Sequence, residues 1–454
     1  MRTRDMTAGK PAKMILAFAL PMMAGNLFQQ LYTIVDAFFV GQYAGMNALA
    51  AVGAADWLSW MVFGIAWGYT QGFSVLISQR FGAGDEQGLK KAVGNSVTLT
   101  AIICISISVV SLLLARPLLH LLQTPDEIME DAAVYLYVLF AALPILGAYN
   151  VQAGILRAVG DAKTPLYAMV IASFTNISLD AVFVIWFRWG VLGAAVATVL
   201  AQGVSAVYCY MILRRIPQVR LTKDELRLQG DNVRQLIRLG TPTAMQNVVI
   251  GVGGTAVQSV VNGYGTVFVA GFTATNKLYG LMEMASVSLG GALSAYVGQN
   301  YGASKFRRIR DGVRIGAVIT TAVSFVIAGL LFIFGRGVLS WFVNAPDPQL
   351  VNDCLDVAQK YLNAMLVGLF VLYLLHAYRC ALQGMGDTVT PMVSGVVELV
   401  MRVGAVMVLP GFIGEWGVYF AELCAWFGAM VLLIAAYYIR VNKLPKTDFA
   451  EGGK

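Results

Sequence analysis

The chain has 454 residues, 58% of them hydrophobic and only 13% charged, and its mean hydropathy is +0.69. Soluble domains carry about 25% charged residues, so this composition excludes an ordinary soluble globule and indicates an integral membrane protein. The net charge of +7 does not indicate a nucleic-acid partner, because the cations lie between apolar runs and on one side of the membrane.

Apolar runs of about 20 residues recur along the chain, and each can cross ~30 Å of hydrocarbon as a helix. We therefore predict an all-α integral membrane fold with twelve transmembrane helices. In the first half they cover residues 14–40, 46–78, 92–115, 132–156, 165–187 and 190–213. In the second half they cover residues 236–262, 266–298, 313–335, 360–383, 391–410 and 416–439.

The sequence is internally duplicated. Residues 160–165 (GDAKTP) return as residues 386–391 (GDTVTP), and the WGV of residues 189–191 returns at 416–418. Six spans per half is an even number, so both halves enter the membrane in the same sense. We predict two six-helix lobes, 1–213 and 236–454, related by a pseudo-two-fold axis along the membrane normal, with a cytoplasmic linker at 214–235 and a short cytoplasmic tail.

Lys and Arg residues are distributed unequally between the loops. With both termini placed in the cytoplasm, 26 of the 32 cations lie on cytoplasmic segments, Arg379 among them, and four lie outside. The remaining two, Lys277 and Arg402, lie within spans. This split predicts a multi-pass protein of the cytoplasmic (inner or plasma) membrane with both termini inside and membrane lipids as partners. Residues 1–13 are too polar to act as a cleavable signal.

Acidic residues inside the apolar runs are the first functional candidates. A charged side chain at the centre of a membrane helix costs ~2.5–3.5 kcal/mol on insertion scales, so such residues are rarely retained without a role. The predicted spans contain Asp36, Asp56, Asp180, Glu283, Glu398 and Glu422.

Two of these acids belong to polar stripes on their predicted helices. The first stripe occupies a ~120° sector of the first span and consists of Asn26, Gln29, Gln30, Thr33 and Asp36. The second, on the fifth span, consists of Ser173, Asn176 and Asp180. A rise of ~1.5 Å per residue places both aspartates in the outer half of one lobe. We predict that Asp36, Asp180 and Asn176 couple a cation and that the rest of the first stripe contacts substrate; the alternative is a buried polar network that only fixes packing.

The second lobe offers further candidates for substrate binding. Asn276, Lys277 and Glu283 lie on the eighth span, and Gln246 and Asn247 on the seventh can present carbonyl oxygens to a cation. Tyr32 and Tyr149 can stack on a cationic substrate, at ~0.5–2 kcal/mol for each contact. Glu398 and Arg402 are four residues apart, so we expect a local ion pair between them. Asp56, Glu422 and His376 are secondary candidates, for which surface position or packing is the simpler interpretation.

Several motifs together resemble the multidrug and toxic compound extrusion (MATE) family, in its bacterial drug-efflux form. They are Pro21 with Asn26 and Gln29, residues 35–41 (VDAFFVG), 79–84 (QRFGAG), 157–161 (RAVGD) and 189–198 (WGVLGAAVAT). The resemblance extends over residues 14–440. It implies two six-helix lobes, export of organic cations against inward H⁺ or Na⁺, and a coupling or substrate role for Asp36. Sodium-coupled members are thought to use acids on the seventh and tenth spans, but residues 236–262 and 361–383 contain none, which favours H⁺.

These observations predict secondary active multidrug efflux, in which organic cations or related amphipathic compounds exchange for inward H⁺ (or Na⁺) by alternating access. The alternatives are a flippase for a lipid-linked precursor, which would need a strongly cationic cavity, and an exporter of one specific metabolite. Walker A, zinc and nucleophile-elbow motifs are absent from the sequence, so we expect no enzymatic activity, no cofactor and no metal. We also expect a monomer with no nucleic-acid partner.

Overall fold

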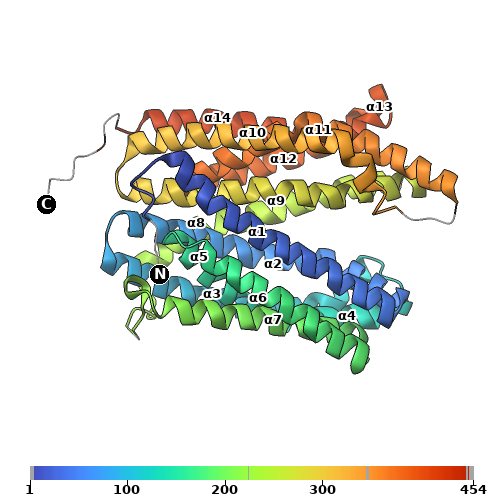
Figure 1. Cartoon of the computed structure of the whole chain (residues 1–454), viewed down its shortest axis with the longest axis horizontal. Coiled ribbons are helices and arrows are strands. Elements are labelled where there is room, and N and C mark those ends of the chain that lie inside the picture. Colours follow the sequence, from blue (N-terminus) through green and yellow to red (C-terminus); the bar gives the residue numbers. More distant parts are fainter. Residues whose placement is uncertain (1–4, 223, 344–346, 446–447, 449–454) are drawn as a thin grey trace. The chain divides into compact units, whose positions relative to one another are not determined.

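The computed structural model describes residues 5–222, 224–343, 347–445 and 448, and every regular element in them is helical (Figure 1). The all-α prediction is therefore confirmed. The last residues of the predicted cytoplasmic tail, 449–454, lie outside the described residues.

Helices of the first half follow one another through short connections. They are α1 (Pro11–Phe39) with the π-helical η1 (Val40–Ala44), α2 (Met46–Gly82), α3 (Glu86–Leu121), α4 (Asp126–Ala141), α5 (Leu143–Ala158), α6 (Lys163–Asp180) with the π-helical η2 (Ala181–Trp186), and α7 (Gly190–Leu213). The short η3 (Pro217–Val219) follows in the linker.

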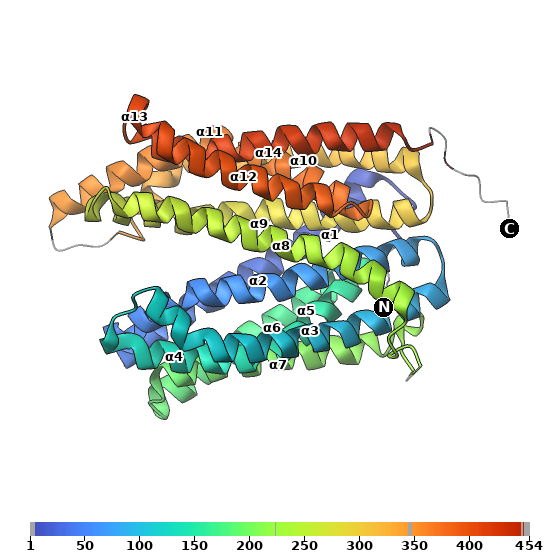
Figure 2. The same cartoon turned by 180° about the vertical axis from the view of Figure 1, so that it is seen from behind.

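The second half repeats this order. It contains α8 (Gly230–Asn262), α9 (Thr266–Gly302), α10 (Phe306–Leu339), α11 (Pro348–Gly384), α12 (Val389–Val408), α13 (Pro410–Ile413) and α14 (Trp416–Asn442). The views in Figures 1 and 2 both place α9 beside α11 and α12 beside α14, and these pairs are in contact.

The duplicated Gly-Asp-x-x-Thr-Pro motif has the same local structure in both halves. Gly160 and Gly386 adopt φ values of 89° and 82°, which a residue with a Cβ rarely adopts. The carboxylate of Asp161 accepts the backbone N–H of Thr164 at 3.0 Å, and that of Asp387 accepts the N–H of Thr390 at 3.1 Å. Each aspartate thus caps the helix that follows, so the motif is a helix-initiating turn.

Contacts divide the described chain into two compact units. The first contains Leu20–Ala244, and the second contains Met6–Ala19 with the residues from Met245 onward. The divisions fall inside α1 and α8, the helices that open the two halves. The lobe and linker boundaries given above stay predictions.

Ten described helices are long and apolar enough to cross a membrane, and α4 with α5, bent by 48° at a short break, makes an eleventh. Pro144 stands in the first turn of α5 and cannot donate the hydrogen bond that would continue α4. The helix α9, expected as a span at 266–298, does not reach this level of hydropathy. It is packed against α10 and α11 and buries Thr275, Ser286 and Ser288. Because protein covers it, it does not need apolar side chains on every face.

Candidate functional site

Two of the predicted aspartates meet inside the first unit. Asp36 lies one turn before the end of α1, and Asp180 is the last residue of α6. Their carboxyl groups lie close enough to act directly on each other. Asp36 is 7% exposed and Asp180 is fully buried. In both helices the α-helix gives way to a π-helical segment shortly after the aspartate, and π-helical turns often occur at functional sites.

The carboxyl pair lacks a basic counter-ion. Across the described residues, no ion pair joins either aspartate to Lys or Arg, and the other charge that acts on Asp36 is the carboxylate of Asp56. Both oxygens of Asp180 and Oδ1 of Asp36 also lack an amide or hydroxyl donor in that part of the chain. Two ionised carboxylates can only accept hydrogen bonds. The contact is therefore favourable when one group is protonated or when a cation lies between them.

Two tyrosines lie within electrostatic reach of both aspartates, Tyr32 of α1 and Tyr135 of α4. Gln202 of α7 donates to the Tyr32 hydroxyl at 3.1 Å. Asn176 of α6 is fully buried, and its amide donates to Thr198 Oγ1 of α7 at 3.4 Å. Helices α1, α4, α6 and α7 therefore contribute polar side chains to the part of the first unit that holds the acid pair.

The sequence did not identify Thr198 and Gln202 as members of the site. Gln202 is the only amide side chain on its predicted span, and this was the one available signal. A single polar residue has no periodicity, so the partner across the helix interface cannot be inferred from it.

The remaining predictions in the first unit do not share one environment. Asn26 and Gln30 are half-buried, whereas Gln29 and Thr33 are exposed. Thr33 Oγ1 donates to the carbonyl of Gln29 at 3.0 Å, so its hydroxyl is used locally. Of the stripe, Asp36 alone is buried.

Two other first-unit candidates also differ in environment. Tyr149 is buried on α5, near Arg157 and Cys209. Asp56 is exposed on α2, in reach of Asp36.

A second buried charge cluster lies in the second unit, and it corrects one prediction. Glu398 pairs with Arg379 of α11, and Arg402 Nη2 lies 2.8 Å from Glu422 Oε2 of α14. The expected local pair between Glu398 and Arg402 was wrong. Arg379, counted from the sequence as a cytoplasmic cation, is 7% exposed inside the unit. Packing of α12 against α11 and α14 brings each of its charged residues to a partner on another helix.

Among the described residues, a third glutamate in this cluster forms no direct ion pair with an arginine. Glu283 of α9 lies 3.8 Å from His376 Nε2 of α11, and Tyr279 contacts the carboxyl of Glu283. His376 Nδ1 is 3.0 Å from the carbonyl of Leu372. The cluster therefore contains three glutamates and two arginines, which leaves one excess negative charge when the histidine is neutral. The side chain of Glu283 is 35% exposed, more than that of any other glutamate or arginine in the cluster.

Other predicted residues of the second unit lie in separate places. Gln246 is buried and accepts a hydrogen bond from Gln383 Nε2 at 3.3 Å, and Asn247 is half-buried beside it in sequence. Asn276 Oδ1 accepts from the Tyr361 hydroxyl at 3.4 Å, while Lys277 is exposed. In the described part of the chain, no group of three or more His, Cys, Asp and Glu side chains is arranged to hold a metal ion.

Comparison with known proteins accounts for this arrangement. The MatE family profile matches residues 21–182 and again 242–407, one match in each half, which agrees with the internal duplication. The probable multidrug resistance protein YpnP of Bacillus subtilis is 30% identical over 76% of this chain and 78% of its own length. The probable multidrug resistance protein YoeA of the same organism is 28% identical over 73% of each chain.

The fold has close counterparts among solved structures. A MOP superfamily transporter from Pyrococcus furiosus superposes with a TM-score of 0.92 at 25% identity, over 98% of each chain. Such structures share the twelve-helix, two-lobe MATE fold, which the sequence had predicted. A duplicated membrane-helix fold, a buried pair of acids with no basic partner in the described part of the chain, and family matches in both halves lead to one conclusion: this chain belongs to the MatE family and is a multi-pass membrane transporter of the bacterial MATE efflux type.

Proposed function

We propose that this transporter exports organic cations in exchange for inward H⁺ by alternating access, with Asp36 and Asp180 as the coupling pair. The observation that carries the proposal is the interaction between their two buried carboxyl groups, neither of which forms an ion pair with lysine or arginine among the described residues. With one proton, the pair can share a hydrogen bond. Without it, two like charges face each other, and the pair attracts a cation.

The exchange follows from competition for this negative charge. A cation arriving from the cytoplasm would be bound by the ionised pair, with the rings of Tyr32 and Tyr135 available for cation–π contacts. A proton arriving from outside would cancel one charge and release the cation. Two unit charges ~4 Å apart interact by about 4 kcal/mol at an effective dielectric constant of about 20. Shifting a two-state equilibrium from 1:99 to 99:1 takes about 5.5 kcal/mol. The binding of one or two protons therefore changes the free energy by an amount of the required size.

The proposal includes the orientation of the protein in the membrane, because the direction in which cation and proton are exchanged depends on it. Both termini would lie in the cytoplasm and the aspartates in the outer half of the cytoplasmic membrane, as the distribution of Lys and Arg favours. Sodium is the alternative coupling ion. In the second unit, Arg379 and Arg402 already neutralise two of three glutamates, which leaves little free negative charge there for Na⁺. The same pairing argues against a flippase, since these arginines are not available to a lipid phosphate.

The test is uptake of an ethidium-like cation into proteoliposomes, with an imposed pH gradient compared with an imposed sodium gradient. We expect the pH gradient alone to drive uptake, and Asp36→Asn to reduce that uptake at least tenfold. Glu130→Gln is the matched control, because it removes an exposed carboxylate that is paired with Arg116 and not with the aspartates. Normal pH-driven uptake by Asp36→Asn, with expression and folding unchanged, would exclude Asp36 from coupling.

A further inference from the structure

A basic pocket lies in the first unit, and neither Asp36 nor Asp180 lines it. It is a cavity of about 490 Å³ lined by Lys90, Arg214, Arg215, Pro217, Arg220 and Thr222. Its walls come from the first turns of α3 and from the linker segment that leaves the end of α7. None of these residues takes part in the exchange proposed above.

The linker residues that follow this pocket are held in place by α3. Asn95 is fully buried, and its amide group donates to the carbonyls of Glu225 and Arg227 at 3.3 and 3.2 Å while accepting the N–H of Gln229 at 2.8 Å. A Cβ at Gly94 would lie 2.1 Å from the carbonyl oxygen of Glu225, so only glycine permits this approach. The linker just past the pocket is therefore fixed against α3, and within the pocket's own stretch η3 also contacts α3.

The pocket has a surplus of positive charge. Four cations line it and no acid does. One carboxylate, that of Glu225, lies in reach of Lys90 and accepts the N–H of Thr222 at 2.6 Å and its hydroxyl. These hydrogen bonds lower the pKa of Glu225 below its usual range, so it counts as one full negative charge at pH 7. The net charge is about +3, and among the described residues Arg215 and Arg220 form no ion pair.

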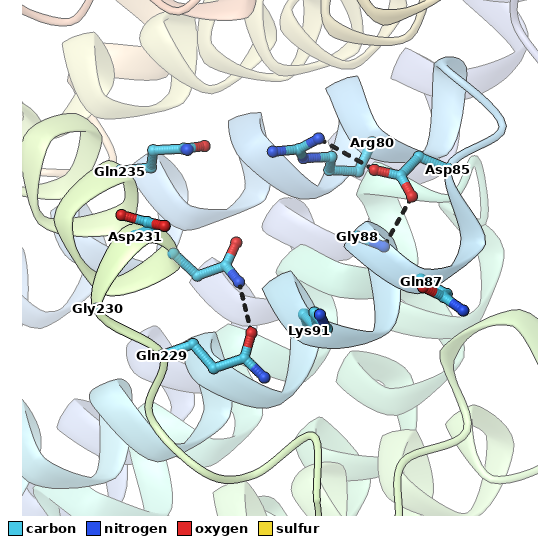
Figure 3. Close-up of a pocket in the computed structure, with 10 residues that line it drawn as sticks. Arg80, Asp85, Gln87, Gly88, Lys91, Gln229, Gly230, Asp231 and Gln235 are labelled. Carbon is cyan, nitrogen blue, oxygen red and sulfur yellow. Dashed lines mark hydrogen bonds and ion pairs between the residues drawn. The ribbon is translucent and has the colours of Figure 1, made fainter.

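A neighbouring pocket provides the contrast. Figure 3 shows this second cavity, of about 460 Å³, where Arg80 is paired with Asp85 at 3.0 Å. Lys91 and Asp231 also line it, so its two cations are balanced by two acids, and its other polar groups are mostly side-chain amides. Lys90 and Lys91, adjacent on α3, thus belong to pockets of different charge. Only the pocket lined by Lys90 is suited to an anion.

We propose that the basic pocket binds the phosphate of an anionic phospholipid headgroup in the inner leaflet. Arg214 and Arg215 follow directly after Leu213, the last residue of the membrane helix α7. In the last turn of α7, Tyr210 and Met211 are about half exposed, and the Arg214 guanidinium lies 5.8 Å from the centre of the Tyr210 ring. Apolar surface for acyl chains thus adjoins cations at headgroup depth, which favours a lipid over a soluble anion. The inner leaflet rests on the orientation proposed above.

The test uses the purified full-length protein in an uncharged detergent. Short-chain phosphatidylglycerol is titrated, with thermal unfolding as the readout, beside phosphatidylcholine of the same chain length and inorganic phosphate. We expect saturable stabilisation by phosphatidylglycerol alone. Each lysine or arginine near an anionic headgroup contributes about 1 kcal/mol, so the Arg215→Gln, Arg220→Gln double variant should bind about 30-fold more weakly. No transport is measured, so failure here is distinguishable from failure of the exchange proposal.

Two comparison variants make the result specific. Arg227→Gln with Lys91→Gln removes the same charge outside the basic pocket and should keep the wild-type affinity. Arg215→Lys with Arg220→Lys keeps the charge and should stay within a few-fold of it, even if the glutamine variant folds poorly. Equal stabilisation by phosphatidylcholine, saturation by inorganic phosphate in the same concentration range, or equal loss in the control variant would each overturn the proposal.

Discussion

Single residues show that the protein treats its buried acids in two ways. Asp36 and Asp180 face each other without a basic partner among the described residues, whereas Glu398 and Glu422 each have an arginine. An acid that must exchange protons or cations cannot be held by a permanent counter-ion. An acid that only ties helices together needs one. The first pair is therefore suited to coupling and the second set to structure.

This distinction predicts that removing one member of an ion pair lowers the stability of the protein much more than removing both. Arg379→Met leaves Glu398 buried and uncompensated, so we expect a loss of about 3–5 kcal/mol in the free energy of unfolding. Replacing both members of the pair, Arg379→Met with Glu398→Leu, should restore most of it because no charge is left buried. Chemical denaturation in detergent measures both values. A double variant as unstable as Arg379→Met would show that the ion pair is not the cause.

The sequence predicted the acids of the site better than their partners. Asp36 and Asp180 were found because a charge inside an apolar run is costly and stands out. The pair Glu398–Arg402 was wrong because helical spacing reveals only partners four residues away, and Arg379 lies on another helix. Gln202 was missed for the same reason: its partner, Tyr32, is distant in sequence, and contacts between helices leave no periodic trace.

Helix positions were predicted well, and departures from regular helix were not. The span predicted at 190–213 is α7 as it stands, and the span predicted at 46–78 is α2 with one further turn. The π-helical segments η1 and η2 were not foreseen, because the same apolar residues fit an α- or a π-helix. Contacts between η1 and η2, and of both with α7, are tertiary features. They lie next to Asp36 and Asp180, where an irregular turn can reposition a side chain.

Close packing between α9 and α11 gives a prediction for this pair of helices. A Cβ at Gly271 would lie 2.6 Å from the carbonyl oxygen of Cys354, whereas at Gly280, on the same helix, nothing lies within 4 Å. Gly271→Ala should therefore force α9 from α11 and cost about 1–3 kcal/mol of stability. Gly280→Ala should be neutral or stabilising by up to about 1 kcal/mol, because alanine favours helix. The thermal unfolding midpoints of the two variants test this prediction, and equal midpoints would contradict the packing argument.

At the scale of the whole molecule, duplication predicts two similar halves, and they are similar in backbone but not in charge. The family profile matches both, and the glycine–aspartate turn recurs in both. Yet the acid pair without a counter-ion occurs in the first unit, and the arginine-bound glutamates occur in the second. A repeat in sequence shows that a fold was copied. It does not show which copy retained which chemistry, because that depends on a few side chains.

This asymmetry predicts that coupling and substrate attraction can be separated. Asp180→Asn removes one of the two carboxyls that share a proton but leaves the carboxylate of Asp36 to attract the cation, so it should abolish pH-driven uptake while leaving a slower downhill exchange of the cation. Glu283→Gln removes the one glutamate of the second cluster without an arginine, and its side chain is 35% exposed. It should raise the KM for the cation about tenfold and leave uptake dependent on the pH gradient.

Initial rates at several cation concentrations, with and without the gradient, separate the two effects. If Glu283→Gln lost its response to the gradient and Asp180→Asn kept it, the coupling site would lie in the second unit, and the charge asymmetry would have the opposite meaning.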